Sequence, residues 1–168
     1  MSPTSSTTVS PTLHLVCGKI ASGKSTLTAR LASAPQTVRI SEDTLLTQLY
    51  PGQIASLADY VACAALLRAA IAPLALQMLR AGVSVVLDFP ANTPASRAWM
   101  RALFQQAGTP HVLHYLDVSD EECKGRLRQR NASGLHPFST SDAQFDEITR
   151  HFTPPDASEG FDIVRIAA

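Results

Sequence analysis

Short apolar runs alternate along the chain with longer segments of helical periodicity. Continuous runs such as 83–87 are typical of strands buried on both faces of a parallel sheet. Ser41 suits a helix N-cap, and Gly82 and Gly108 suit helix ends. The predicted elements are strand 13–17, helix 24–32, strand 37–40, helix 41–50, a helix of about 25 residues from 56, strand 83–87, helix 94–107, strand 111–116, helix 119–130, helix 141–152 and strand 162–166.

Strands that alternate with helices require crossover connections, so the sheet is predicted to be mainly parallel and covered on both faces. The expected fold is therefore a three-layer α/β/α domain, with ligands at the carboxyl ends of the strands. The chain has 168 residues and is 45% hydrophobic, which suits one domain without disulfide or metal support. This domain is predicted over 12–168, after a Ser-, Thr- and Pro-rich lead at 1–11 that we expect to be disordered.

The apolar stretch 61–81 is long enough to cross a membrane. Arg68, Pro73, Gln77 and Arg80 interrupt it, and each is costly in a lipid-facing span. The stretch is therefore interpreted as a largely buried helix, bent at Pro73.

Charge and cysteine content exclude several classes of protein. Fourteen basic and fourteen acidic side chains balance, so no overall basic excess favours nucleic acid, although a local patch remains open. Cys17, Cys63 and Cys123 lie too far apart for a disulfide framework or a Cys-x-x-Cys site, which favours a reducing, cytoplasmic setting. His111 and His114 are three apart on a strand and should point to opposite faces, so we interpret them as ordinary strand residues.

A complete phosphate-binding motif follows the first strand. It fits G-x-x-x-x-G-K-[ST] through Gly18, Lys19, Ile20, Ala21, Ser22, Gly23, Lys24 and Ser25. Backbone amides of such a loop cradle phosphates, and the following helix directs its positive N-terminus at them. Lys24 is expected to reach the β and γ phosphates of ATP, Ser25 to bind Mg²⁺, and Thr26 to complete the nucleotide site. The alternative is a plain glycine turn between strand and helix.

Two acidic residues follow the second strand. Asp43 is the candidate base that accepts the proton of an acceptor hydroxyl, and Glu42 competes for that role. The alternative is that both only favour the helix N-terminus.

Asp88 comes directly after the apolar run 83–87, the pattern of a carboxylate that helps hold Mg²⁺ or orients the acceptor. On its own, an Asp at the end of a strand is common.

Three arginines lead into the Gly- and Pro-containing loop 131–140. Arg126 and Arg130 share one helix face. We interpret 126–140 as a lid whose arginines close over the triphosphate and stabilise the transition state. The alternative for Arg126, Arg128 and Arg130 is a solvated helix face.

Taken in order, these motifs make residues 12–166 similar to small P-loop kinases of the AAA_33 or zeta-toxin-like group. That group includes polynucleotide 5'-kinase domains and chloramphenicol phosphotransferase. The resemblance implies a five-stranded sheet in the order 2-3-1-4-5. It also implies a base at Asp43 in a Ser-x-Asp motif, an acceptor site that includes Asp88 and Arg97, and a lid with Arg126 and Arg130. Pro154-Pro155 and Glu159-Gly160-Phe161 match a segment near the adenine.

Leu46 departs from the group, because polynucleotide kinases carry an Arg three residues after the base. With the neutral charge, this favours a small hydroxyl-bearing acceptor over nucleic acid. Five aromatic residues either line an apolar acceptor pocket or pack in the core: Tyr50, Tyr60, Phe89, Trp99 and Phe138. The sequence thus predicts an ATP- and Mg²⁺-dependent phosphotransferase. A 5'-hydroxyl polynucleotide kinase and a non-catalytic ATP-binding regulator are the alternatives.

Overall fold

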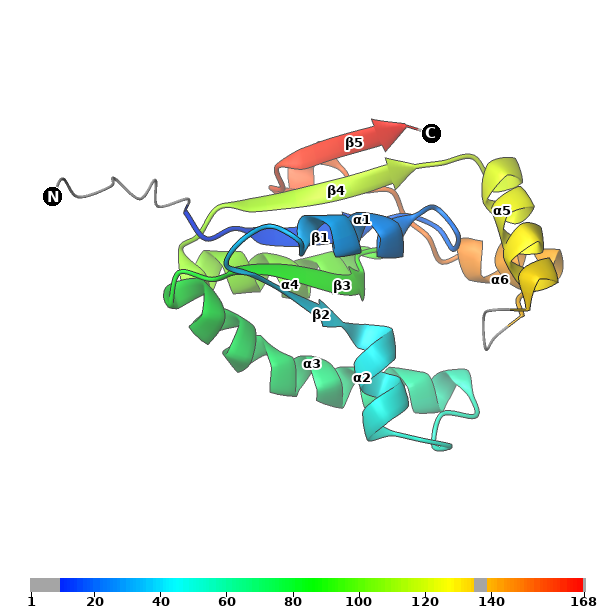
Figure 1. Cartoon of the computed structure of the whole chain (residues 1–168), viewed down its shortest axis with the longest axis horizontal. Coiled ribbons are helices and arrows are strands. Elements are labelled where there is room, and N and C mark those ends of the chain that lie inside the picture. Colours follow the sequence, from blue (N-terminus) through cyan, green and yellow to red (C-terminus); the bar gives the residue numbers. More distant parts are fainter. Residues whose placement is uncertain (1–9, 135–138, 168) are drawn as a thin grey trace, which may run out of the picture.

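The computed structural model describes residues 10–134 and 139–167. The five strands form one parallel sheet in the order β2-β3-β1-β4-β5 (Figure 1), as predicted. The strands are β1 Leu13–Cys17, β2 Thr37–Ser41, β3 Ser84–Pro90, β4 His111–Asp117 and β5 Ile163–Ala167. The helices are α1 Lys24–Leu31, α2 Glu42–Leu49, α3 Leu57–Arg80, α4 Pro94–Ala107, α5 Asp120–Ser133, α6 Asp142–Thr149 and a short 3₁₀ helix, Ala157–Glu159.

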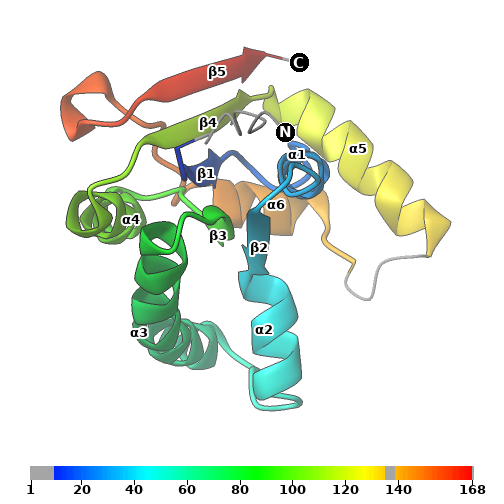
Figure 2. The same ribbon diagram turned by 60° about the vertical axis from the view of Figure 1, so that its left-hand side comes forward.

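Helices cover both faces of this sheet, which gives the three-layer arrangement seen in Figure 2. Alternate side chains of β1 point to opposite faces, so Leu15 belongs to one core and Val16 to the other. The core around Leu15 packs against α2, α3 and α4. The core around Val16 packs against α1, α5 and Phe145 of α6. Apolar cores on both faces of the sheet explain why the central strands β1 and β3 are mostly apolar.

The histidines of β4 confirm the alternation. His111 stacks on Phe104 of α4 at 3.6 Å between ring centroids. On the other face, His114 lies 3.1 Å from His14 between ring nitrogens, and burial lowers the pKa of His114 to about 4. Within 10–134 and 139–167, no group of three or more possible metal ligands includes them.

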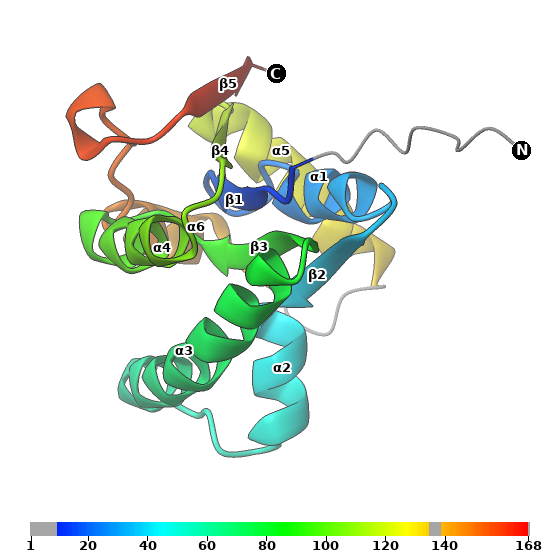
Figure 3. The same ribbon diagram turned by 90° about the vertical axis from the view of Figure 1, so that its left-hand side faces the viewer.

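Helix α3 corrects the expectation of a largely buried helix. It begins at an N-cap by Ser56, runs through Pro73, and buries one stripe formed by Ala64, Leu67, Ile71, Ala75 and Leu79. Its opposite face is open, with Leu57 74% and Leu66 62% exposed. Length and composition alone would allow α3 to span a membrane, as they would for many helices of soluble proteins. The helix packs on α2, α4 and β3, and no further layer of the described chain covers it (Figure 3).

Three elements end more than one residue away from their predicted ends. β3 continues two residues past Asp88, to Pro90, because β1 shifts register between Leu15 and Val16 and the Ala91 amide still donates to Val16. α5 extends to Ser133, and α6 ends earlier, at Thr149. Of the predicted N-terminal lead, 1–9 lies outside the described residues.

Candidate functional site

The phosphate-binding loop connects β1 to α1 at the carboxyl edge of the sheet, as predicted. Gly23 has φ +102°, which a residue with a side chain rarely adopts. At Gly18, an added Cβ would lie 3.1 Å from the carbonyl oxygen of Leu116, so only glycine fits that approach. The Gly18 amide donates to Oδ1 of Asn92 at 3.0 Å, which ties the loop to the segment after β3.

Lys24 begins α1 and turns its side chain back into the loop. Its Nζ donates to the carbonyl oxygens of Gly18 and Lys19, both at 2.6 Å. Burial lowers the pKa of Lys24, whereas the nearby charges of Asp88 and Asp43 oppose that shift. The ammonium group is therefore within electrostatic reach of both candidate carboxylates.

Other side chains of the loop suit a polyphosphate. The Ser22 hydroxyl is buried and has no hydrogen-bond partner among the described residues, a costly state that a phosphate oxygen would relieve. Ser25 and Thr26 are exposed on the first turn of α1, where the helix dipole favours anions. Lys19 contributes only its backbone, because its Nζ binds the Val118 carbonyl and Asp120.

Asp88 lies on β3 beside the ladder partner Ser41 of β2. Oδ2 of Asp88 accepts a hydrogen bond from Thr28 at 3.2 Å and forms an ion pair with Arg39. Ser25 and Asp88 fit Mg²⁺, because this ion takes oxygen ligands and needs few protein groups when phosphates supply the rest. A bound ion would share Asp88 with Arg39.

The first two residues of α2 point in different directions. Glu42 is 1% exposed, and its Oε1 accepts a 2.5 Å hydrogen bond from Tyr60. Burial raises the pKa of Glu42. Asp43 is exposed, and the Ser41 N-cap makes the local bond to the Thr44 amide at 3.4 Å. Of the two acidic residues, only Asp43 can meet a substrate.

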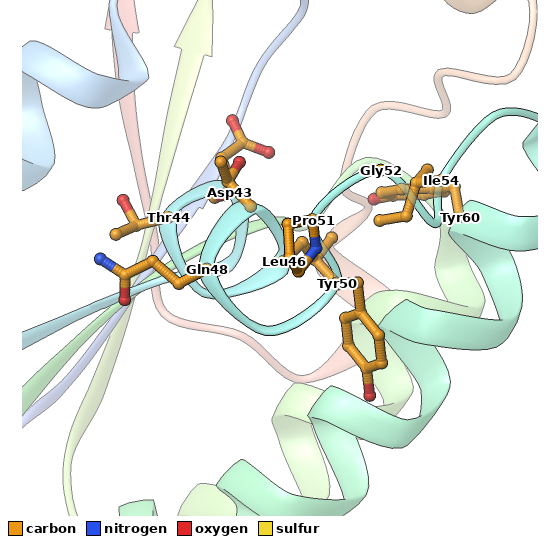
Figure 4. A pocket seen from close by; sticks show the side chains of 10 residues that line it. Asp43, Thr44, Leu46, Gln48, Tyr50, Pro51, Gly52, Ile54 and Tyr60 are labelled. Atoms are coloured by element: carbon orange, nitrogen blue, oxygen red, sulfur yellow. Dashed lines mark hydrogen bonds between the residues drawn. The ribbon is translucent and has the colours of Figure 1, made fainter.

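Asp43 opens onto a cavity of about 660 Å³ between α2 and the start of α3. Figure 4 shows Asp43, Thr44 and Gln48 on one side of the cavity wall and Ile54 and Tyr60 on the other. Tyr50 and Tyr60 are among the residues that line it. Phe89 is 1% exposed and packs on Trp99, which fits the core reading, and Phe138 lies outside the described residues.

The three arginines of the predicted lid have different surroundings. Arg126 donates from Nη1 to the Ser22 carbonyl at 3.2 Å and so rests on the loop. Arg130 is partly buried, and its Nε has no partner among the described residues. Arg128 turns outward to Asp142 at 2.7 Å. The middle of the lid, 135–138, lies outside the described residues.

Arg97 is the one predicted acceptor-site residue that the structure places elsewhere. It is fully buried, and two of its nitrogens bind the Glu159 carboxylate at 2.7 and 2.9 Å. Nη1 donates to the carbonyl oxygens of Ala91 and Thr153 at 3.0 and 2.8 Å. The Arg97 side chain has no surface left for a substrate, so its assignment to the acceptor site is corrected. Its role is to join α4 to the 3₁₀ helix.

Arg97→Met should lower the free energy of unfolding by about 3 kcal/mol or more, because it removes the ion-pair partner of Glu159 and the donor of three carbonyl oxygens, those of Ala91, Thr153 and Pro154. Urea denaturation followed by circular dichroism measures this change. Arg80→Met is the matched control, since Arg80 is exposed and makes one bond, to the Gln106 carbonyl at 3.1 Å. Equal stability of the two variants would contradict the structural role.

Three residues near the site were not predicted: Arg39, Arg68 and Asn92. Arg68 of α3 points inward to Glu42 and lies 5.8 Å from the Trp99 ring centroid. Within an apolar helix its charge was interpreted as an obstacle to membrane insertion. A single charge on the inward-facing side of an apolar helix could have indicated that Arg68 has a functional role. Arg39 and Asn92 gave no signal, because their partners are distant in sequence.

Comparison with known proteins identifies the domain. A family model described as an AAA domain, AAA_33, matches residues 13–155. No curated protein sequence matches the chain. Among solved structures, the chain is similar to a putative kinase from Chloroflexus aurantiacus, with TM-score 0.73, 21% identity and coverage of 94% of this chain and 85% of that one. It is also similar to the Mycobacterium tuberculosis APS kinase CysC, with TM-score 0.58, 20% identity and coverage of 94% and 88%. A fungal RNA kinase has TM-score 0.56, 16% identity and coverage of 94% and 73%.

Proposed function

The chain belongs to the AAA_33 family of AAA domains, and we propose on that premise that it transfers the γ-phosphoryl group of ATP to a hydroxyl of a small molecule. The observation that carries the proposal is the position of Asp43. This exposed carboxylate lies within electrostatic reach of Lys24 of the phosphate-binding loop and opens onto the cavity beside α2. A nucleotide switch without an acceptor needs no such group.

In the proposed reaction, an oxygen of the acceptor forms a bond to the γ phosphorus while the bond to the β–γ bridging oxygen breaks, and ADP leaves. Asp43 takes the proton of the acceptor hydroxyl. Lys24 and the loop amides hold the phosphate oxygens, and Arg126 adds positive charge beside Ser22. Mg²⁺, held by Ser25 with Asp88 nearby, would neutralise phosphate charge.

The size of the cavity beside Asp43 supports a small acceptor. The cavity beside α2 and Asp43 measures about 660 Å³, within the range of sites for small molecules. The APS kinase, a sugar kinase and a gluconokinase among the similar structures act on small molecules by their descriptions, and the fungal RNA kinase on RNA. Overall neutrality of the chain favours the first group.

The test is transfer of label from γ-³²P-ATP into a panel of polyhydroxy alcohols, sugar acids, nucleosides and 5'-hydroxyl oligonucleotides. We expect label in at least one small molecule and none with a Lys24→Ala preparation. Label only in oligonucleotides, with steep salt dependence, would replace the proposal by a polynucleotide kinase. Binding of ATP with no transfer to any member of the panel would favour a regulatory nucleotide-binding protein.

A further inference from the structure

A second cavity, of about 350 Å³, lies between the phosphate-binding loop, the segment after β3, α3 and α6. We call it the Arg68 cavity. Its walls include Lys19, Tyr60, Arg68, Asn92, Thr93 and His151. No Asp or Glu is among its lining residues. Tyr60 also lines the cavity beside Asp43, so the two cavities share a wall.

The Arg68 guanidinium is held in place but makes little use of its donors. Its Cζ lies over the Trp99 ring at 5.8 Å to the centroid, within the range of a cation–π contact. Its nearest acceptor is Oε2 of Glu42, at 3.4 Å from Nη2. Nε is buried without a partner among the described residues. A guanidinium has five N–H donors, so most of those on Arg68 have no hydrogen-bond partner among the described residues.

The charge of Arg68 is only partly balanced. Glu42, its one ion-pair partner among the described residues, is buried and is already the acceptor of the 2.5 Å bond from Tyr60. Burial raises the pKa of Glu42, which disfavours its charged form. The Arg68 side chain is 29% exposed, toward a cavity with no acidic lining residue, and the other charged lining residue, Lys19, is paired with Asp120. Such surroundings favour an anion over a neutral or cationic group.

We propose that the Arg68 cavity binds an anionic group of the acceptor, a carboxylate or a phosphate, through the Arg68 guanidinium. Its identification as the acceptor rests on the proposed phosphotransferase function, but binding of the anion does not. An acceptor held there and long enough to pass Tyr60, which lines both cavities, would bring its hydroxyl to the side of the proposed base. The acceptor class is then a hydroxy acid or a phosphorylated alcohol.

Trp99 provides a direct readout, because it is the single tryptophan of the chain and the Arg68 guanidinium lies over it. The phosphate-binding loop is first saturated with ADP and Mg²⁺, so that added anions meet the remaining site. Three matched three-carbon probes are then titrated at constant ionic strength: glycerate, glycerol 3-phosphate and neutral glycerol. We expect a saturable change of Trp99 fluorescence with at least one of the two anions and none with glycerol.

Arg68→Met should weaken binding of the effective anion roughly 10- to 100-fold, since it removes a charge-assisted bidentate contact but keeps an apolar stem on Trp99. Arg68→Lys retains the charge without the planar fork and should also bind the anion more weakly than the natural protein. Arg80→Met, on the same helix, should bind it as the natural protein does. An equal response to glycerol, no response to either anion, or Arg68 variants that bind the anion unchanged would overturn the proposal.

Failure of this inference is distinguishable from failure of the proposed function. Fluorescence reports the bound anion whether or not a phosphoryl group is transferred. If anions bind and no label is transferred to any acceptor, the Arg68 cavity stands and the kinase assignment fails. If label is transferred only to neutral alcohols and no anion binds, the kinase assignment stands and the anionic acceptor is excluded.

Discussion

Lys24→Ala should lower the turnover number for phosphoryl transfer by roughly 10³-fold, with a smaller loss of ATP affinity. The Lys24 ammonium is the group of the loop that can stabilise the negative charge on the γ-phosphate as the bond to the leaving oxygen breaks. Initial rates of ADP formation with the acceptor from the label-transfer panel give the turnover number. Calorimetric titration with ATP gives the affinity.

The control for this change must account for the structural bonds of Lys24. Its Nζ holds the Gly18 and Lys19 carbonyl oxygens, so a thermal melt of the variant shows whether the loop and the domain survive. Lys124→Ala is the matched variant, because Lys124 of α5 binds Asp146 at 2.7 Å, away from the loop. A folded Lys24→Ala protein with undiminished turnover would exclude Lys24 from the catalytic site.

Asp43→Asn should lower the turnover number by about 10²- to 10⁴-fold, the range that a positioned general base contributes. The amide has nearly the shape of the carboxylate but cannot accept the hydroxyl proton. ATP affinity should stay within about twofold, because the proposed role of Asp43 lies on the acceptor side. Single-turnover label transfer and ATP titration separate the two quantities.

Glu121→Gln provides the comparison for Asp43→Asn, since Glu121 is an exposed carboxylate in the first turn of another helix, α5. It should leave the turnover number unchanged. Retained turnover in Asp43→Asn, with ATP still bound, would remove Asp43 as the base and would return the residue to the capping role that its position on α2 also allows.

The phosphate-binding loop and the sheet order could be predicted because both follow from local signals. The loop needs glycine at Gly18 and Gly23 for backbone reasons, and these residues are part of the motif itself. Strand and helix periodicity then leads to a parallel sheet, and the family resemblance supplied the order of its strands. These features depend little on contacts between distant residues.

The choice between Glu42 and Asp43 could not be made from the sequence. Neighbouring residues of a helix point about 100° apart, so only one of the two can face inward. Which one does so is decided by Tyr60 and Arg68, which come from α3 and surround Glu42. The sequence shows neither contact.

The surroundings of buried arginines and of the apolar helix α3 could not be predicted from the sequence either, because they depend on contacts between distant residues. Arg97 and Arg68 both lie in helices, yet Glu159 and backbone carbonyls bury the first, while the second faces a cavity. The apolar composition of α3 correctly predicted a helix but not its burial. Composition does not specify whether a further layer covers the outer side.

The central place of β1 has a consequence for the order in which the protein acquires function during synthesis. β1 is made first, but its neighbours are β3 and β4, and His14 meets His114 across a separation of 100 residues. The loop after β1 is completed only when Asn92 reaches Gly18 and Val118 reaches Lys19. A nascent chain shorter than this therefore carries the whole nucleotide-binding motif without the sheet that shapes it. The loop therefore takes its final shape only after β3 and β4 have both left the ribosome.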